Sequence, residues 1–165
     1  MDGTGIAVGG NLVVDYLKVI DSYPKQGNLS TISSISKSVG GALPNVLIDL
    51  AKMDPQLTLQ AIGLVGDDED GEFVLSLLEK HNINTQLIGK EANANTSFTD
   101  VMTVESTGER TFFHYRGANS LLGLEHFDFD RIHGGLLHIG YLLLLDTLDS
   151  YDEKYGTVLA RTLAM

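Results

Sequence analysis

A glycine pair that runs straight into a helix start, at positions 38–45, constrains this chain more than any other feature. Gly40 and Gly41 come first, and Pro44 and Asn45 follow at the head of an apolar stretch. Glycine permits a sharp turn and a close ligand approach, and a first helical turn leaves free N–H groups. Proline suits that turn because its nitrogen has no hydrogen to leave unpaired. The segment predicts either a polar-ligand site at Gly40, Gly41 and Asn45 or a tight strand-to-helix turn without a ligand.

Buried strands are expected to alternate with helices along most of the chain. The expected strands are 6–10, 59–65 and the start of 136–145; the expected helices are 44–53, one capped by Asp67 or Asp68 and ending near 81–85, and 149–164. Apolar runs indicate the strands and helical spacing of apolar residues indicates the helices. Such alternation is typical of an α/β fold with a mostly parallel sheet.

Two polar, β-rich segments do not fit that core. Residues 15–39 alternate in part between polar and apolar, and residues 96–115 read as a hairpin with arms 98–104 and 110–115. The turn at 106–109 contains glycine, as hairpin connections often do. Half-exposed antiparallel strands show this kind of pattern. The two segments therefore predict a small separate sheet.

Four segments, in this order, resemble the amino-terminal half of the PfkB/ribokinase family of carbohydrate kinases. They are the strand 6–10 running into 11–15, the segment Gly40-Gly41 with Asn45, the Gly-Leu-Val-Gly-Asp-Asp turn at 63–68 followed by Gly71, and 115–119. The resemblance implies part of a ribokinase-like three-layer α/β/α sandwich with a small β-sheet lid. The lid would comprise residues 15–39 and 96–116 and would also form a homodimer contact.

The resemblance also implies that residues 1–165 form only the amino-terminal, sugar-binding part of such a kinase. The family's Asn-x-x-Glu segment and its Asp-Thr-x-Gly-Ala-Gly-Asp segment, which carries the catalytic base and the anion hole, do not occur in the sequence. No catalytic, cofactor-binding or metal-ligating residue is therefore expected in this chain. ATP and Mg²⁺ would act in the full-length parent, and this chain alone is expected to bind neither and to be inactive.

The resemblance assigns sugar binding to Asp15, Gly40, Gly41 and Asn45. A carboxylate suits this role because it accepts hydrogen bonds from hydroxyls; the alternative for Asp15 is a solvated turn. Ribose-specific relatives carry Asn where this chain has Val13, which argues against ribose itself.

Arg116 has two equally supported interpretations. It stands at the end of a predicted lid strand, where it would bind a substrate carboxylate or phosphate, or it is a surface arginine paired with one of the many acids. Some relatives that act on sugar acids carry Tyr-x-Arg here, whereas this chain has His114-Tyr115-Arg116. The acidic turn 66–71 is interpreted as helix capping and not as a metal site, because it lacks the ligand spacing of a calcium loop.

Composition excludes several classes of protein. With 22 acidic and 11 basic residues, the net charge is −11 and a nucleic-acid or anionic-membrane partner is not expected. There is no cysteine, which fits a reducing cytoplasm and removes disulfides and thiolate zinc sites. The first residues lack the pattern of a signal peptide, so a cytoplasmic location is expected.

The sequence therefore supports three hypotheses. The first is the sugar-binding half of an ATP-dependent kinase for a hydroxyl of a small sugar or sugar acid. The second is a non-catalytic sugar-binding or regulatory module with a kinase-like fold. The third is a folded but idle truncation product. In the first two cases the partner is a small sugar or sugar acid.

Overall fold

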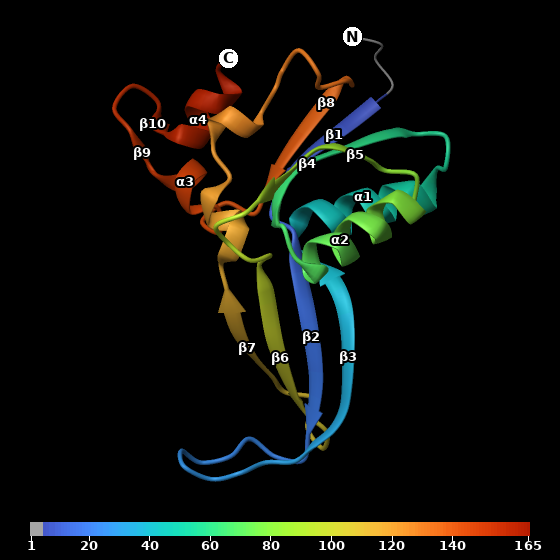
Figure 1. The fold of residues 1–165 in the computed structure, drawn as a ribbon, viewed down its shortest axis with the longest axis vertical. Coiled ribbons are helices and arrows are strands. Elements are labelled where there is room, and N and C mark those ends of the chain that lie inside the picture. Colours follow the sequence, from blue (N-terminus) through green and yellow to red (C-terminus); the bar gives the residue numbers. More distant parts are fainter. Residues whose placement is uncertain (1–4) are drawn as a thin grey trace.

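The computed structural model describes residues 5–165, which form a parallel sheet between two helical layers and a second sheet that projects from it (Figure 1). The central sheet has four parallel strands in the order β5-β4-β1-β8. Its strands are β1 (Gly5–Gly10), β4 (Thr58–Gly66), β5 (Asn84–Glu91) and β8 (Leu136–Gly140). The expected α/β fold with a parallel sheet is confirmed.

Two amphipathic helices cover one face of this sheet. These are α1 (Ala42–Met53) and α2 (Glu69–Lys80). The second face carries short elements: η1 (Gly117–Leu121), η2 (Leu124–His126), α3 (Asp146–Asp149), the strand pair β9 (Tyr151–Asp152) and β10 (Gly156–Thr157), and α4 (Val158–Leu163). The layers are those of a partial three-layer α/β/α sandwich.

Strand β4 shows why the two layers form. Every residue of β4 after the first is buried, so both faces of the strand need an apolar cover. Ala61 and Val65 belong to the core beneath α1 and α2, whereas Ile62 and Leu64 belong to the core on the second face. The alternation of side chains along one strand thus supplies both cores.

The two polar β-rich segments form one sheet, here called the lid sheet. Its strands are β2 (Val13–Ile20), β3 (Ile32–Gly40), β6 (Phe98–Val104) and β7 (Arg110–Tyr115). The order is β3-β2-β6-β7, with β2 and β6 parallel and the outer pairs antiparallel. The sheet extends away from the body and touches it mainly at its base (Figure 1).

Two expectations about local structure are wrong, and one strand was not expected. Residues 149–164 are not one helix: Ser150 ends α3, the β9–β10 pair turns before Gly156 at φ 84°, and only α4 is helical. The start of 136–145 is a strand as expected, β8, but it is only partly buried, since Leu136 is 54% exposed at the sheet edge. Strand β5 was not expected at all. Within residues 5–165, no helix is both long and apolar enough to cross a lipid bilayer.

Candidate functional site

A row of polar side chains crosses the base of the lid sheet. Asp15 on β2 is in register with Ser38 on β3 and with Thr99 on β6, and Thr99 is in register with His114 on β7. Residues in register on neighbouring strands point to the same face, so these four side chains lie side by side. The row lies beside the Gly40–Gly41 turn, where β3 leads into α1.

Asp15 and Gly40 are in close contact. A Cβ atom placed on Gly40 would lie 2.3 Å from Asp15 Oδ2, so only glycine fits beside this carboxylate. Burial raises the pKa of the Asp15 carboxyl above its usual range, while His114 and the Thr99 hydroxyl oppose the rise. The carboxylate is therefore held half-buried with free acceptor capacity at the lid base.

His114, like Thr99 and Ser38, lies in the polar row but was not proposed as a ligand from the sequence. Its Nδ1 lies 2.9 Å from Thr99 Oγ1. Burial lowers the pKa of His114, and the positive charge of Arg116 lowers it further, while Asp15 acts in the opposite direction. The only signal in the sequence was its place two residues before Arg116 on a lid strand.

The glycine turn itself is fixed by a buried asparagine. Gly41 caps α1 with φ 99°, and a Cβ there would lie 2.4 Å from the Asn11 carbonyl oxygen. Asn11 Oδ1 accepts hydrogen bonds from the backbone N–H groups of Ala42 (2.9 Å) and Tyr141 (3.1 Å). One side chain thus joins the ends of β1 and β8 to the start of α1.

A second buried asparagine holds the β1–β2 connection. Asn119 accepts from the Leu12 N–H at 3.0 Å and donates to the Leu12 carbonyl at 2.9 Å. Asn11 and Asn119 are 2% and 1% exposed. Both act on partners far away in the chain, so no local pattern could identify them.

Asn45 lies apart from the polar row. It is exposed in the first turn of α1, beside a cavity of about 430 Å³ between β3, α1 and α2 that Lys37, Phe73 and His81 also line. Its side chain makes no hydrogen bond to another residue within 5–165. The structure therefore brings together Asp15, Gly40 and Gly41, but it records no contact of the Asn45 amide with Asp15.

Arg116 is paired with an acid. Its guanidinium forms an ion pair with Asp146 at the start of α3 and lies 3.5 Å from the Leu143 carbonyl oxygen. This is the second of the two interpretations that the sequence allowed. The positive charge of Arg116, which follows the end of β7, is thus already balanced by the Asp146 carboxylate.

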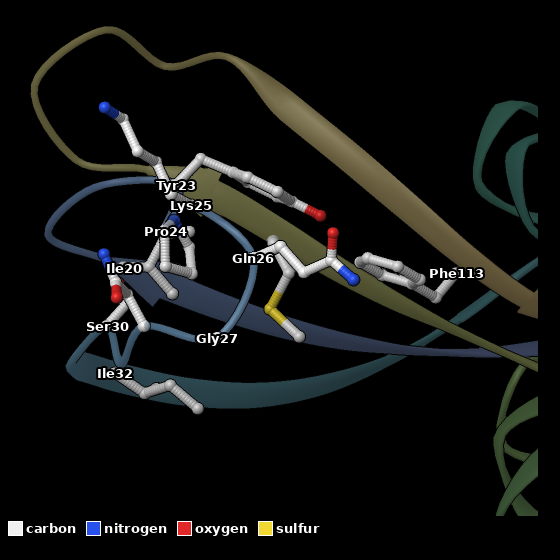
Figure 2. A pocket seen from close by; sticks show the side chains of 11 residues that line it. Ile20, Tyr23, Pro24, Lys25, Gln26, Gly27, Ser30, Ile32 and Phe113 are labelled. Atoms are coloured by element: carbon white, nitrogen blue, oxygen red, sulfur yellow. The ribbon is translucent and has the colours of Figure 1, made fainter.

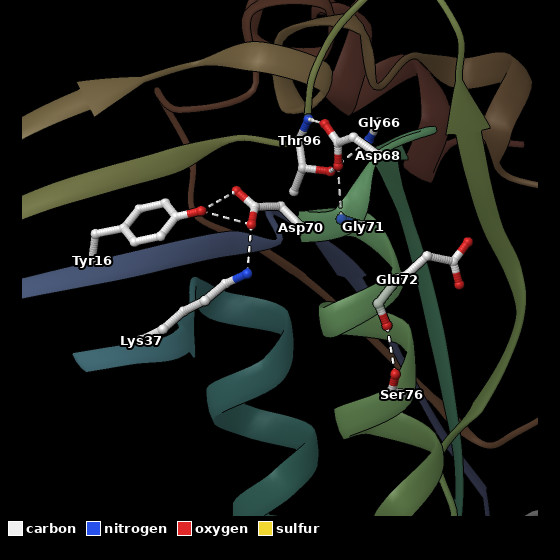
Figure 3. A network of polar contacts seen from close by, with 9 residues as sticks. All are labelled: Tyr16, Lys37, Gly66, Asp68, Asp70, Gly71, Glu72, Ser76 and Thr96. Carbon is white, nitrogen blue, oxygen red and sulfur yellow. Dashed lines mark hydrogen bonds and ion pairs between the residues drawn. The ribbon is translucent and has the colours of Figure 1, made fainter. Parts of the chain in front are cut away.

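The acidic turn before α2 caps the helix and joins it to both sheets (Figure 3). Asp68 accepts from the N–H of Gly71 at 2.8 Å and from the N–H and hydroxyl of Thr96, each at 2.7 Å. The Thr96 hydroxyl in turn accepts from the Gly66 N–H. No group of three or more His, Cys, Asp or Glu among residues 5–165 is arranged to hold a metal ion.

The tip of the lid sheet carries a separate cavity of about 420 Å³ (Figure 2). The 21–31 loop between β2 and β3 curls over it, and Ile20, Met102 and Phe113 contribute apolar side chains from three strands. It lies at the end of the lid sheet opposite the polar row and is no part of that row.

Comparisons with known proteins identify the family. The family model for the pfkB family carbohydrate kinase matches residues 6–154. A probable fructokinase-2 of Arabidopsis thaliana is 29% identical over 87% of this chain and 43% of its own length. A fructokinase-2 of Oryza sativa subsp. japonica is 31% identical over 87% of this chain and 44% of its own length. The chain thus spans less than half the length of these curated relatives.

Comparison with solved structures leads to the same family. A fructokinase from Xylella fastidiosa superimposes with a TM-score of 0.66 at 26% identity, covering 82% of this chain and 40% of that one. A nucleoside kinase from Methanocaldococcus jannaschii, described as an archaeal member of the ribokinase family, gives a TM-score of 0.74 at 19% identity, covering 93% and 50%. Because the family model covers most of the sequence and these folds agree, the chain belongs to the pfkB family of carbohydrate kinases.

Proposed function

We propose that this chain is the sugar-binding part of an ATP-dependent carbohydrate kinase, with ATP and Mg²⁺ bound by residues outside it. The observation that carries the proposal is the Asp15 carboxylate, held against Gly40 and beside Thr99 and His114. A carboxylate, a hydroxyl and an imidazole together offer the acceptors and donors that sugar hydroxyls need. Membership of the family supplies the reaction class.

The division of labour follows from the chemistry of phosphoryl transfer. That reaction depends on positioning, on groups that stabilise the charge of the transferred phosphoryl, and on a base for the attacking hydroxyl. The polar row provides positioning, and the lid sheet provides a cover that limits the access of water. The base and the anion-stabilising groups are assigned to a Gly-Ala-Gly-Asp type of segment outside this chain, so the chain alone should not catalyse transfer.

The substrate we propose is a small neutral sugar, with fructose as the first one to test. Two observations support this choice: the curated relatives are named fructokinases, and Asp146 already neutralises Arg116. A sugar acid is the second candidate, because Arg116 lies at the lid base and its 42% exposure leaves it accessible to an anion. The exposed apolar side chains of the lid sheet are proposed as a homodimer contact.

Calorimetric titration of the 165-residue chain with fructose, ribose and gluconate tests the proposal. We expect weak fructose binding that Asp15→Ala abolishes, with no ADP release when ATP and sugar are added together. If the Asp15→Ala variant bound fructose as well as the wild type, the proposed sugar site would be wrong. Turnover by the chain alone would refute the division of labour. Binding without turnover in a longer protein that contains this chain and the Gly-Ala-Gly-Asp segment would favour the regulatory module.

A further inference from the structure

One contact network joins the lid sheet to the body directly behind the polar row (Figure 3). Asp70 lies in the first turn of α2, and Oδ1 of its carboxylate accepts from the Tyr16 hydroxyl at 2.7 Å and from Lys37 Nζ at 2.6 Å. Its Oδ2 accepts from the same Tyr16 hydroxyl at 2.8 Å. A single side chain of the body thus binds two strands of the lid sheet.

The two lid residues that Asp70 binds are partners of each other. Tyr16 on β2 is in register with Lys37 on β3, so Asp70 binds the two strands at the same position along the sheet. The Lys37 ammonium also lies 4.4 Å from the centre of the Phe73 ring on α2, a favourable cation–π distance. Charge-assisted hydrogen bonds of this kind are stronger and more directional than neutral ones.

The next register pair along the strands belongs to the polar row. Asp15 and Ser38 form the register pair next to Tyr16 and Lys37. Their side chains point to the opposite face, because side chains alternate along a strand. Whatever fixes the backbone at Tyr16 and Lys37 therefore also fixes Asp15, one peptide unit away. The Asp15 carboxylate has little freedom to shift, because Gly40 closes the space on one side.

We propose that Asp70 is a positioning residue of the sugar site, which holds the Tyr16–Lys37 pair and so sets where Asp15 stands at the base of the lid sheet. The role in sugar binding rests on the function proposed above. Asp70 touches no sugar in this arrangement, because its side chain lies on the far side of the lid strands. It acts through the backbone of β2 and β3.

The surrounding charges define the variants needed to test this role. Tyr16 faces Asp68, Asp70 and Asp100, and burial together with the hydrogen bond to Asp70 raises the pKa of Tyr16 to about 12. Lys18 pairs with Asp100 and so is not available to replace Lys37. Asp70→Asn removes a negative charge and the ion pair with Lys37, whereas Tyr16→Phe removes only a neutral hydroxyl. Glu69→Gln is the matched control, since Glu69 is exposed, one residue away, and makes no hydrogen bond to the lid sheet within the described part of the chain.

The first measurement is the fructose affinity of the 165-residue chain and its variants, determined by calorimetry. We expect Asp70→Asn and Tyr16→Phe each to weaken binding by about tenfold, and Glu69→Gln to leave it unchanged. The double variant should lose little more than either single variant, because both break the same contact. Additive losses, or equal losses in the Glu69→Gln control, would overturn the proposal.

The second measurement needs no sugar. We expect backbone amides of residues 14–17 to exchange with solvent at least about tenfold faster in Asp70→Asn and Tyr16→Phe, while amides at the lid tip keep their rates. NMR titration of the Asp15 carboxyl should show its pKa moving toward the usual value in Tyr16→Phe, which alters no charge.

If the wild-type chain binds no sugar, the proposed function fails, and the exchange and titration results still decide whether Asp70 positions Asp15. Unchanged exchange and an unchanged Asp15 pKa would overturn the positioning role.

Discussion

The Asp15 carboxylate and the Cα atom of Gly40 are so close that the methyl group of an alanine at position 40 would lie only 2.3 Å from Asp15 Oδ2. Gly40→Ala should therefore push the carboxylate out of the polar row. We expect a loss of about 1–3 kcal/mol in the free energy of unfolding, as in other overpacked sites, together with loss of sugar binding.

Gly108→Ala serves as the comparison for that variant. Gly108 lies at the far end of the β6–β7 hairpin with φ 71°, and a Cβ atom placed on it would have no neighbouring atom within 4 Å. Alanine there costs about 1 kcal/mol through backbone conformation alone and leaves sugar affinity unchanged. Urea unfolding and calorimetry on both variants separate a local steric effect from general destabilisation. Intact sugar binding in Gly40→Ala would contradict the contact.

The raised pKa of Asp15 gives the chain a defined pH dependence. Because the folded pKa exceeds the unfolded one, the folded state favours the protonated carboxyl. This contribution is complete below the unfolded pKa of about 3.9 and is lost as the pH rises through the folded pKa. Asp15→Asn does not ionise, so it should gain stability relative to the wild type between about pH 4 and pH 7. The gain is at most about 1.4 kcal/mol for each pH unit between the two pKa values, because solvent screens a half-buried group. Urea unfolding across this range measures the gain, and a constant difference would contradict it.

The contribution of Asp68 to stability should change with pH in the opposite direction to that of Asp15. Burial by itself would raise its pKa, but hydrogen bonds from Thr96 and Gly71 outweigh it and lower the pKa of Asp68 overall. Its stabilising effect is present above the unfolded pKa and disappears as the pH falls through the folded pKa. At neutral pH, Asp68→Ala should cost about 1–2 kcal/mol through loss of the helix cap. Asp67→Ala, at a neighbouring exposed position, should cost little, and thermal unfolding of the two variants at neutral and acid pH tests both statements.

The Arg116–Asp146 pair should control the preference between neutral and acidic sugars. Asp146→Asn releases the guanidinium, so affinity for gluconate should rise relative to fructose by about tenfold, the scale of one charge-assisted hydrogen bond. Arg116→Gln should abolish that gain when added to Asp146→Asn. Calorimetry with both ligands checks the effect. An unchanged gluconate-to-fructose ratio in Asp146→Asn would leave Arg116 as a structural residue only.

The lid sheet should mediate self-association. Phe112 and Phe113 on β7 are 60% and 51% exposed, and Ile35 on β3 is 66% exposed. Exposed apolar side chains gathered on one sheet favour association. We expect light scattering to show a dimer of the wild-type chain and a monomer when both phenylalanines are replaced by serine. A wild-type monomer at high concentration would refute the association, and a dimer that persists in the variant would assign it to the exposed edge of β8.

Sequence patterns located the elements that carry strong local signals. The hairpin arms 98–104 and 110–115 coincide with β6 and β7, because Gly108 marks the turn between two alternating segments. Asp68 was one of two residues expected to cap the second helix, and it does so. The parallel sheet followed from the alternation of strands with helices. Local physics alone decides features of this kind.

Other features depend on distant partners and were therefore missed. Strand β5 is polar apart from Leu87 and its neighbour Ile88, and it is fixed by pairing with β4. Between residues 149 and 164 the apolar spacing suggested a helix, but Asp152 accepts hydrogen bonds from the N–H groups of Lys154 and Tyr155 and bends the chain instead. The role of Asn11, buried between three elements, could not be seen before those elements were assembled.

The order of strands in the lid sheet has a consequence for how the chain folds. Each outer pair joins strands close in sequence, but the central pairing of β2 with β6 links Val14 to Phe98 across the whole first part of the body. A pairing that closes so long a loop carries a large entropy cost and forms slowly unless the intervening chain is already compact. The lid sheet should thus be the last part to assemble and the first to open, so the sugar site would exist only in molecules whose α/β body is already complete.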